Sequence, residues 1–330
     1  MKRSAQFIAA STIALGALFA SARSAAEAAE GPVAAGPIGG TDIRSAALPP
    51  PGLYGGVIGL DSSVGEIHDG TGHPAPGLDA VDLNAKIAAP FLVYVPDAKV
   101  FGGSIGVLGV FSAGAECGRV FSITPSRCIT GFGDPYFEAA WSRSFGQLRP
   151  SRDAGAFPIL EGLSVLVGLG AVIPIGAYDA ALQRFNGLSL GNKTLDVAPS
   201  VAVTYTTPPL LAEGTELSAK LYWNQYWENP VTQYKASPLV DVDFAVSEHV
   251  GRFQVGVAGV YIFQTGLDRV AGVVVPPDGR RLEYMAVGPV LNYDMPDLGA
   301  AIRVKALQTI LAHNSGVSRV FVVGFAKKLY

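Results

Sequence analysis

Charged residues are scarce in this sequence. Asp, Glu, Lys and Arg make up 15% of its 330 residues, whereas an average soluble domain carries about 25%. The net charge is −3, and Lys and Arg nowhere form the clusters that nucleic-acid binding requires. We therefore expect no nucleic-acid partner. With 49% hydrophobic residues, the chain is also too apolar to be intrinsically disordered.

Long hydrophobic runs are missing as well. The mean hydropathy is high, at +0.33. Yet beyond residue 30 no uninterrupted apolar run reaches the roughly 18 residues that a membrane-spanning helix needs. This argues against a helical membrane protein for the main part of the chain. The apolar residues must instead be distributed in a shorter repeating pattern.

The N-terminal end resembles a targeting signal. A basic start, an apolar stretch and an Ala-x-Ala cleavage site follow one another within residues 1–22, as in a secretory signal peptide. We predict that this segment is cleaved; an uncleaved anchor is the alternative, although the apolar stretch is short. Residues 23–50 are rich in Ala, Gly and Pro without periodicity, which predicts a flexible leader. Residues 51–330 then form the folded domain.

Cysteine and histidine are rare. Cys117 and Cys128 are the two cysteines, and their even number and close spacing in an exported chain predict a disulfide that closes a small loop. The four histidines are scattered, and none has the spacing of a metal site. We expect no metal and no cofactor.

Alternation of apolar and polar residues is the dominant pattern. Between Val240 and Val246, Val or Phe occupies every second position, and Asp241 and Asp243 lie between them. Because successive side chains of a strand point to opposite faces, this segment is predicted to be a strand with one apolar and one acidic face. Residues 217–226 follow the same pattern.

About twelve segments of this kind can be recognised. Many are far longer than the usual 5–6 residues of a globular strand, and about 9–11 tilted residues suffice to cross a bilayer. Long and short connections alternate, as in outer-membrane barrels, except that 147–160 is long where a short turn is expected. The predicted strands are 51–60, 81–95, 98–117, 132–146, 161–174, 192–206, 213–228, 232–247, 250–265, 281–293, 298–313 and 317–330.

An all-β transmembrane barrel explains these observations better than a soluble β-sandwich, which is the alternative. Aromatic residues such as Tyr94, Trp223 and Trp227 lie near strand ends, where the aromatic girdles of membrane barrels occur. We predict an antiparallel barrel of about 12 strands in the outer membrane of a Gram-negative bacterium. It would contact outer-membrane lipid and require the barrel-assembly machinery during biogenesis.

Polar residues on the non-apolar face of the predicted strands are candidates for the lumen wall. Asp241 and Asp243 could do acid–base chemistry, but a charged wall balanced by basic residues is the favoured interpretation. The candidate lumen residues are Asp82, Asn84, Lys86, Glu138, Lys220, Asn224, Asp241, Asp243, Arg303 and Lys305.

A search for catalytic motifs yields one weak candidate. Ser62 and Ser63 precede His68 by a few residues, but the serines do not stand in the Gly-x-Ser-x-Gly motif of many hydrolases. A polar outer loop between the first two strands is the favoured interpretation of this segment. We therefore predict that the protein is not an enzyme.

Several blocks of sequence carry a resemblance to a known family. Residues 131–137 (GFGDPYF), 173–179 (IPIGAYD), 240–244 (VDVDF) and 287–289 (VGP) resemble the outer-membrane protein family associated with the meta-pathway of phenol degradation. The resemblance extends in order over roughly residues 50–330. It implies an outer-membrane channel for aromatic or other hydrophobic compounds.

The sequence thus predicts a passive channel for small hydrophobic or aromatic compounds. Barrels of this strand number are narrow or filled by side chains. Passage would then need an inward-folded loop, the N-terminal leader or a lateral opening. The alternatives are an outer-membrane enzyme of the lipid hydrolase type and a structural barrel with a plugged lumen.

Overall fold

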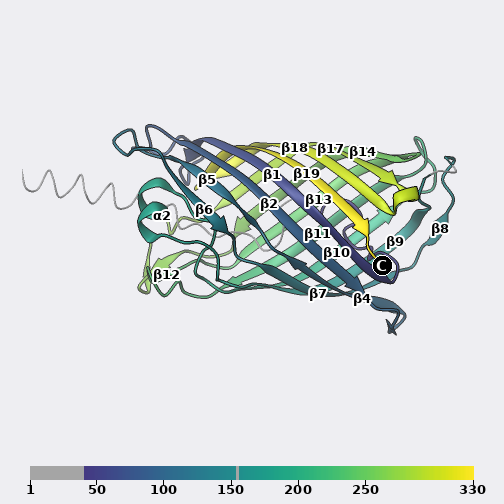
Figure 1. Cartoon of the computed structure of the whole chain (residues 1–330). Coiled ribbons are helices and arrows are strands. Elements are labelled where there is room, and N and C mark those ends of the chain that lie inside the picture. The colour runs from purple at the N-terminus through teal and green to yellow at the C-terminus, as the bar shows by residue number, and fades with distance from the viewer. Residues whose placement is uncertain (1–40, 154–155) are drawn as a thin grey trace, which may run out of the picture.

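The barrel closes between its first and last strands. In the computed structural model, which describes residues 41–153 and 156–330, β1 (Gly52–His68) pairs with both β2 (Asp82–Val95) and β19 (Ser315–Lys328). All neighbouring strands are antiparallel, and together they form a closed twelve-stranded barrel (Figure 1). The prediction of an all-β barrel of about 12 strands is confirmed.

Two of the twelve strands are interrupted. The third consists of β4 (Gly103–Val110) and β5 (Ala113–Arg119), and the fourth of β6 (Arg127–Phe132) and β7 (Tyr136–Ser144). The other strands are continuous. They are β9 (Ile159–Val172), β10 (Asp196–Thr206), β11 (Thr215–Tyr226), β13 (Leu239–Val250), β14 (Phe253–Gln264), β17 (Glu283–Met295) and β18 (Ala300–His313).

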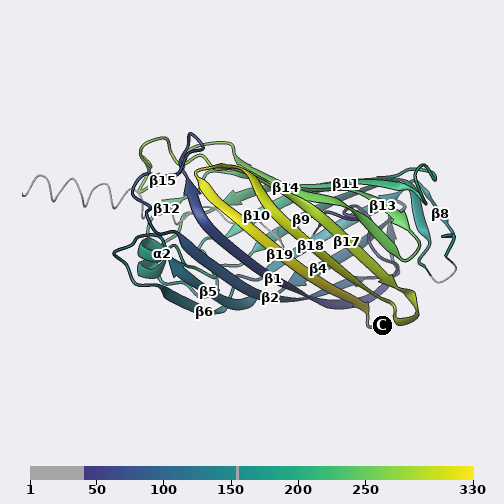
Figure 2. The same ribbon diagram turned by 90° about the horizontal axis from the view of Figure 1, so that it is seen from above.

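The interruption leaves the barrel wall incomplete beside β6. β7 pairs with β4 and β9, but β6 pairs with β5 alone. The connection 173–195 lies against β6 instead, where the Ala177 amide donates to the Phe132 carbonyl at 2.8 Å. This connection contains α2 (Ala180–Asn186), which lies beside β5 and β6 in both views (Figures 1 and 2).

α2 begins and ends for local reasons. The Asp179 carboxylate accepts hydrogen bonds from the Ala181 and Leu182 amides, and Gly187 ends the helix in the left-handed conformation. The helix has seven residues. In the described parts of the chain, no helix is long and apolar enough to cross a bilayer.

The two ends of the barrel differ in their connections. The loop end carries 69–81, 120–126, 173–195, 227–238 and 265–282, and the turn end carries shorter connections such as 251–252 and 296–299. β1 begins and β19 ends at the turn end (Figure 1). The connection between β7 and β9 is the exception at this end, because it contains β8 (Gln147–Arg149), which pairs with β9.

Shorter elements complete the two ends. At the loop end, β12 (Tyr234–Lys235), β15 (Arg269–Val270) and β16 (Val273–Val274) form a small separate sheet. The Asp268 carboxylate holds it in place, accepting from the Ser237 amide at 2.7 Å and the Gln264 side chain at 2.6 Å. At the turn end lie β3 (Lys99–Val100) and the 3₁₀ helix η2 (Pro296–Leu298).

The outer and inner faces follow the alternation of the sequence. On β11, Leu217, Leu221 and Trp223 point outward, whereas Lys220 and Tyr222 are buried inside the barrel. A lipid-facing surface of this kind is apolar. Period-two alternation therefore accounts for a high mean hydropathy without a long apolar run.

The strand boundaries correct three expectations. β1 continues to His68, so Ser62 and Ser63 lie within a strand, opposite Val320 and Arg319 of β19, and the predicted outer loop there is wrong. The predicted strand 98–117 is interrupted. The predicted long connection 118–131 contains β6. The predicted signal peptide lies outside the described residues.

Candidate functional site: the barrel lumen

The N-terminal residues of the described chain lie inside the barrel. Residues 41–46, which we name the lumen segment, run through its turn-end half. The Thr41 amide and hydroxyl both donate to the Asp243 carboxylate, at 3.1 and 2.6 Å. The Arg44 guanidinium lies 2.8 Å from the Asp294 carboxylate, and the Arg44 amide donates to Glu216 at 2.8 Å. These contacts tie the segment to β11, β13 and β17.

Asp42 is the most deeply buried anchor of the lumen segment. Its carboxylate lies 2.6 Å from the Lys305 ammonium and 3.1 Å from the Arg303 guanidinium. The Asp42 and Lys305 side chains are each 1% exposed. A buried charge of this kind is tolerated only when its partner compensates for the lost hydration. The pair therefore holds the lumen segment in one position.

Apolar contacts fill the space around these polar ones. Ile43 packs against Ala245, Ala258 and Val290. Ala46 packs against the other side of the lumen, and its carbonyl accepts from the Ser142 hydroxyl at 2.5 Å. The prediction of a flexible leader is therefore wrong for residues 41–46. The available signal was the alternation of charged and apolar side chains within residues 41–46. The surrounding residues, rich in Ala, Gly and Pro, obscured this signal.

A charged layer lies next to the lumen segment on the side of the loop end. The Lys220 ammonium lies 2.7 Å from both carboxylate oxygens of Glu138, and the Ser200 hydroxyl donates to Glu138 at 2.7 Å. The Lys220 ammonium also lies 4.7 Å from the centre of the Tyr222 ring. A side chain on Gly168 would collide with Glu138, because a Cβ there would lie 2.3 Å from its Oε1. Glycine at this position thus makes room for the ion pair.

A cavity of about 250 Å³ occupies the loop-end half of the lumen. Aliphatic side chains from β1, β2, β4 and β9 form part of its wall, among them Ile58, Ile87, Val110 and Val172. Three carboxyl groups also line it: Glu116, Asp134 and Asp196. The cavity therefore combines an apolar wall with acidic groups.

Strand register places the polar side of this cavity on four adjacent strands. Tyr136 of β7 lies opposite Val172 of β9, Val172 lies opposite Asp196 of β10, and Asp196 lies opposite Tyr226 of β11. All four residues line the cavity. Gly170 leaves space for the phenol of Tyr136, since a Cβ there would lie 2.3 Å from its hydroxyl oxygen.

The connection 173–195 closes the same cavity beside the interrupted wall. The Asp134 carboxylate accepts from the Gly176 amide at 2.6 Å and from the Asn192 amide at 2.8 Å. The Glu116 carboxylate accepts from the Ser189 amide at 2.9 Å. The blocks at 131–137 and 173–179, far apart in the sequence, thus meet at the edge of the cavity.

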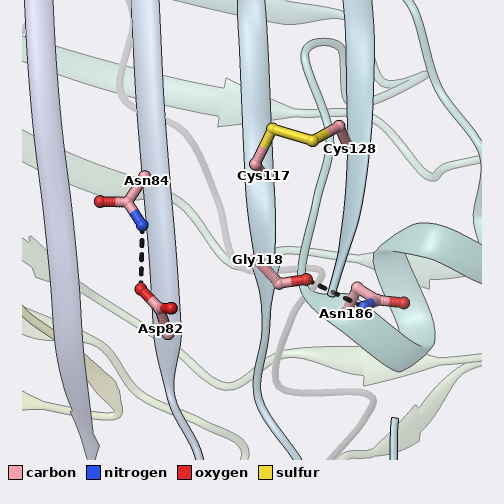
Figure 3. Close-up of a disulfide and its surroundings, with 6 residues drawn as sticks. All are labelled: Asp82, Asn84, Cys117, Gly118, Cys128 and Asn186. Carbon is pink, nitrogen blue, oxygen red and sulfur yellow. Dashed lines mark hydrogen bonds between the residues drawn. A yellow bond between two sulfur atoms is a disulfide. The ribbon is translucent and has the colours of Figure 1, made fainter. Parts of the chain in front are cut away.

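The predicted disulfide is confirmed and lies beside this region. Cys117 of β5 and Cys128 of β6 are bonded and occupy directly opposite positions of the hairpin (Figure 3). The Asn186 amide group donates to the Gly118 carbonyl at 3.0 Å, which joins the end of α2 to the hairpin (Figure 3). The disulfide thus reinforces a hairpin in which β6 has no neighbouring strand on its other side.

Most of the predicted lumen residues are found inside the barrel. Glu138 and Lys220 pair with each other, Lys305 and Arg303 bind Asp42, and Asp243 binds Thr41. The remaining two, Asn224 and Asp241, are also buried.

Three of the candidates lie on the other face. Asp82, Asn84 and Lys86 point outward from β2; the Lys86 side chain is 76% exposed and lies 2.7 Å from Asp61, and Asn84 donates to Asp82 (Figure 3). Their prediction as lumen residues is wrong. The apolar residues of the opposite parity, such as Ile87, line the cavity instead.

The sequence interpretation also missed polar residues of the lumen. Asp196 and Tyr136 are the first residues of β10 and β7 and line the cavity, but neither is among the predicted lumen residues. Glu216 and Asp294 lie on the inward parity of β11 and β17 and bind the lumen segment. Among the described residues, no group of three or more side chains is arranged to hold a metal ion.

The fold and the lumen define the class of this protein. A closed antiparallel barrel with an apolar outer surface and a polar interior is the architecture of outer-membrane barrels. Residues 65–308 match a family described as "Putative MetA-pathway of phenol degradation". This match covers well over half of the chain, and the protein belongs to that family.

A solved structure of similar fold supports the assignment of the fold. The chain is similar to the COG4313 outer membrane channel from Pseudomonas putida F1, with a TM-score of 0.66 and 13% identity, over 86% of this chain and 98% of that one. The transport unit of the autotransporter AIDA-I from Escherichia coli gives a TM-score of 0.47 and 10% identity, over 88% of this chain and 93% of that one. No curated protein matches the chain.

Proposed function

We propose that this protein is an outer-membrane channel for the passive passage of small hydrophobic or aromatic compounds. The observation that supports it best is the apolar cavity in the loop-end half of the lumen, which is of a size and character to hold such a compound. The likeness to the outer membrane channel from Pseudomonas putida F1 agrees with this function.

The proposal includes the setting of the barrel. The turn end faces the periplasm and the loop end faces outward, because bacterial outer-membrane barrels have short periplasmic turns and longer extracellular loops. Residues 1–22 act as a cleaved signal peptide, the barrel-assembly machinery inserts the chain, and lipid of a Gram-negative outer membrane surrounds it.

Passage has two stages in this proposal. A compound first reaches the cavity between the loops or beside the interrupted wall, where connection 173–195 replaces a strand pairing. The lumen segment then has to move, because it occupies the turn-end half through Asp42, Arg44 and Ile43. The residues buried along this route, such as Lys220 and Asp243, line the path.

A reversible lock on the lumen segment tests this proposal. The Ser45 and Ser218 hydroxyl oxygens lie 2.7 Å apart, so S45C/S218C can form a disulfide across the lumen. Uptake of a radiolabelled aromatic solute is measured in a Gram-negative host that carries either the wild-type or the locked barrel. We expect uptake with the wild type, loss with the oxidised variant and recovery after reduction.

Two comparisons complete the experiment. Reduced wild type shows whether breaking the Cys117–Cys128 bond has its own effect, and each single cysteine variant shows the effect of the substitution.

A structural barrel with a plugged lumen is the second candidate function, favoured by the buried Asp42–Lys305 pair. Uptake no higher than in a host without the barrel would favour that candidate and reject the channel.

A further inference from the structure

We propose that the loop-end cavity selects amphiphiles with a protonated amine and binds their ammonium group at Asp196. This inference rests on the channel function proposed above and names the substrate class more narrowly. It is carried by three features of the cavity: the acidic nature of its ionisable groups, the lack of a side-chain donor to one of them, and the apolar part of the wall.

The ionisable side chains of the cavity carry one sign. Glu116, Asp134 and Asp196 line it, and none of the described lining residues is Lys, Arg or His. The nearby ammonium of Lys220 is engaged by both oxygens of Glu138, at 2.7 Å each. In their ionised form, the carboxyl groups attract a cation and repel an anion of the same shape.

The three carboxyl groups differ in their hydrogen bonds. Asp134 accepts from two backbone amides, and Glu116 accepts from one. Asp196 is 2% exposed, and among the described residues no side chain donates a hydrogen bond to its carboxylate, although the Gln225 backbone amide lies within reach. A buried carboxylate with so little compensation is costly, and a ligand that brings a further donor reduces that cost.

The surroundings of Asp196 fit an ammonium group on an apolar body. The Tyr136 hydroxyl, which lies within reach of the Glu138 carboxylate, lines the same cavity, and its oxygen can accept a hydrogen bond from a second ammonium proton. The Tyr226 ring lies directly across the strand pair from Asp196, and aromatic rings attract cations. Ile58, Ile87 and Val110 line the same cavity and offer an apolar wall to a ring or short alkyl chain.

A second buried carboxylate lies farther along the lumen. Asp241 is 1% exposed, and neither of its oxygens has a partner among the described residues. It lies opposite Tyr222, whose hydroxyl lies 3.2 Å from the Thr41 hydroxyl of the lumen segment. An ammonium that leaves Asp196 towards the turn end thus meets another carboxylate before it reaches the segment.

Equilibrium binding to the whole barrel in lipid nanodiscs tests the inference. The probes are 2-phenylethylamine, 2-phenylethanol and phenylacetate, which share a ring and differ in the charge of the terminal group. Isothermal titration calorimetry, with empty nanodiscs subtracted, gives the affinities. We expect the amine to bind about tenfold or more tighter than the alcohol, as for a charge-assisted hydrogen bond, and phenylacetate to bind weakest.

Two substitutions assign the preference to Asp196. D196N keeps the shape and should reduce the amine-to-alcohol ratio to about one. D61N removes the outward carboxylate that pairs with Lys86 and should leave the ratio unchanged. Heat-modifiable gel mobility confirms that each variant is folded.

The outcomes separate this inference from the channel function. Equal affinity for amine and alcohol, or an amine preference that survives in D196N, overturns the assignment of the amine site while aromatic uptake in the locking experiment still stands. Absence of uptake in that experiment rejects the channel, whatever the calorimetry shows. Absence of binding by every probe overturns the cavity as a ligand site.

Discussion

The two halves of the lumen solve the problem of buried polar groups differently. In the turn-end half, charges are paired within the protein: Asp42 with Lys305, and Arg44 with Asp294. In the loop-end half, Asp196 has no side-chain donor among the described residues and borders a cavity. Paired charges make an interior rigid, whereas a carboxylate without a side-chain donor beside free volume can bind a ligand. In the function we propose, the first half closes the barrel and the second half binds the solute.

The largest effect is expected at the most deeply buried pair of the turn-end half. D42A leaves the Lys305 ammonium buried without its carboxylate, which typically costs about 3–5 kcal/mol. We expect the lumen segment to leave its position and single-channel conductance in planar bilayers to rise severalfold. D61A breaks the exposed Asp61–Lys86 pair on the outer face, which is worth about 1 kcal/mol or less, and should leave conductance unchanged. Equal conductance of D42A and the wild type would contradict this role of Asp42.

The loop-end half is stabilised by the Cys117–Cys128 disulfide. C117S/C128S removes the bond across the β5–β6 hairpin, and a disulfide around a loop of this length contributes about 2–3 kcal/mol. We expect protease cleavage near connection 120–126 in the variant, because β6 has no second neighbouring strand. The turn end should stay resistant. Uniform loss of resistance at both ends would show that the hairpin is not an independent unit.

The shape of the cavity depends on one glycine. G170A places a methyl group where the Tyr136 hydroxyl lies, and overpacking of this kind costs about 1–3 kcal/mol. We expect Tyr136 to turn into the cavity and the affinity for aromatic probes to fall several-fold. G324A is the matched control, since no atom lies within 4 Å of a Cβ there. Similar affinities for both variants would mean that Tyr136 does not bound the ligand space.

The smallest effect concerns pH at the turn end. Burial alone would raise the pKa of Glu213, but hydrogen bonds from the Ser151 hydroxyl and from the Arg152 and Gly251 amides lower it below its usual value. This carboxylate therefore stabilises the fold above its ordinary pKa, near 4.5, and the contribution disappears as the pH falls through the lowered value.

E213Q isolates this contribution. Between neutral and acidic pH, the free energy of unfolding of the wild type should fall by at most about 1 kcal/mol because of this group. The variant should lack that part of the pH dependence. Thermal unfolding followed by gel mobility at several pH values measures it, and parallel curves for both proteins would remove Glu213 as the cause.

Sequence periodicity predicted the wall of the barrel well. On β11 and β13, the inward positions Lys220, Asp241 and Asp243 follow directly from the alternation, because the outward positions must be apolar in lipid. The same rule failed on the loop-end part of β2. There the cavity requires an apolar inner face at Ile87, and Lys86 faces outward, where the barrel carries polar side chains.

The lumen contents were harder to predict. Asp42 lies 263 residues from Lys305 in the sequence, and no local pattern links two positions so far apart. The sequence pattern does not predict the interruption of the fourth strand. The short connection 133–135 between β6 and β7 is set by Asp134, whose carboxylate accepts hydrogen bonds from the distant connection 173–195.

By itself, the sequence determined that the chain forms long antiparallel strands with one apolar face. Period-two alternation is a property of each strand, since side chains alternate whatever the neighbours are. Only the tertiary structure decided which face encloses the lumen at each height, that residues 41–46 fill its turn-end half, and that Asp196 borders a cavity. Those features depend on closure of the barrel, which brings distant strands around a common space and leaves some groups paired and others not.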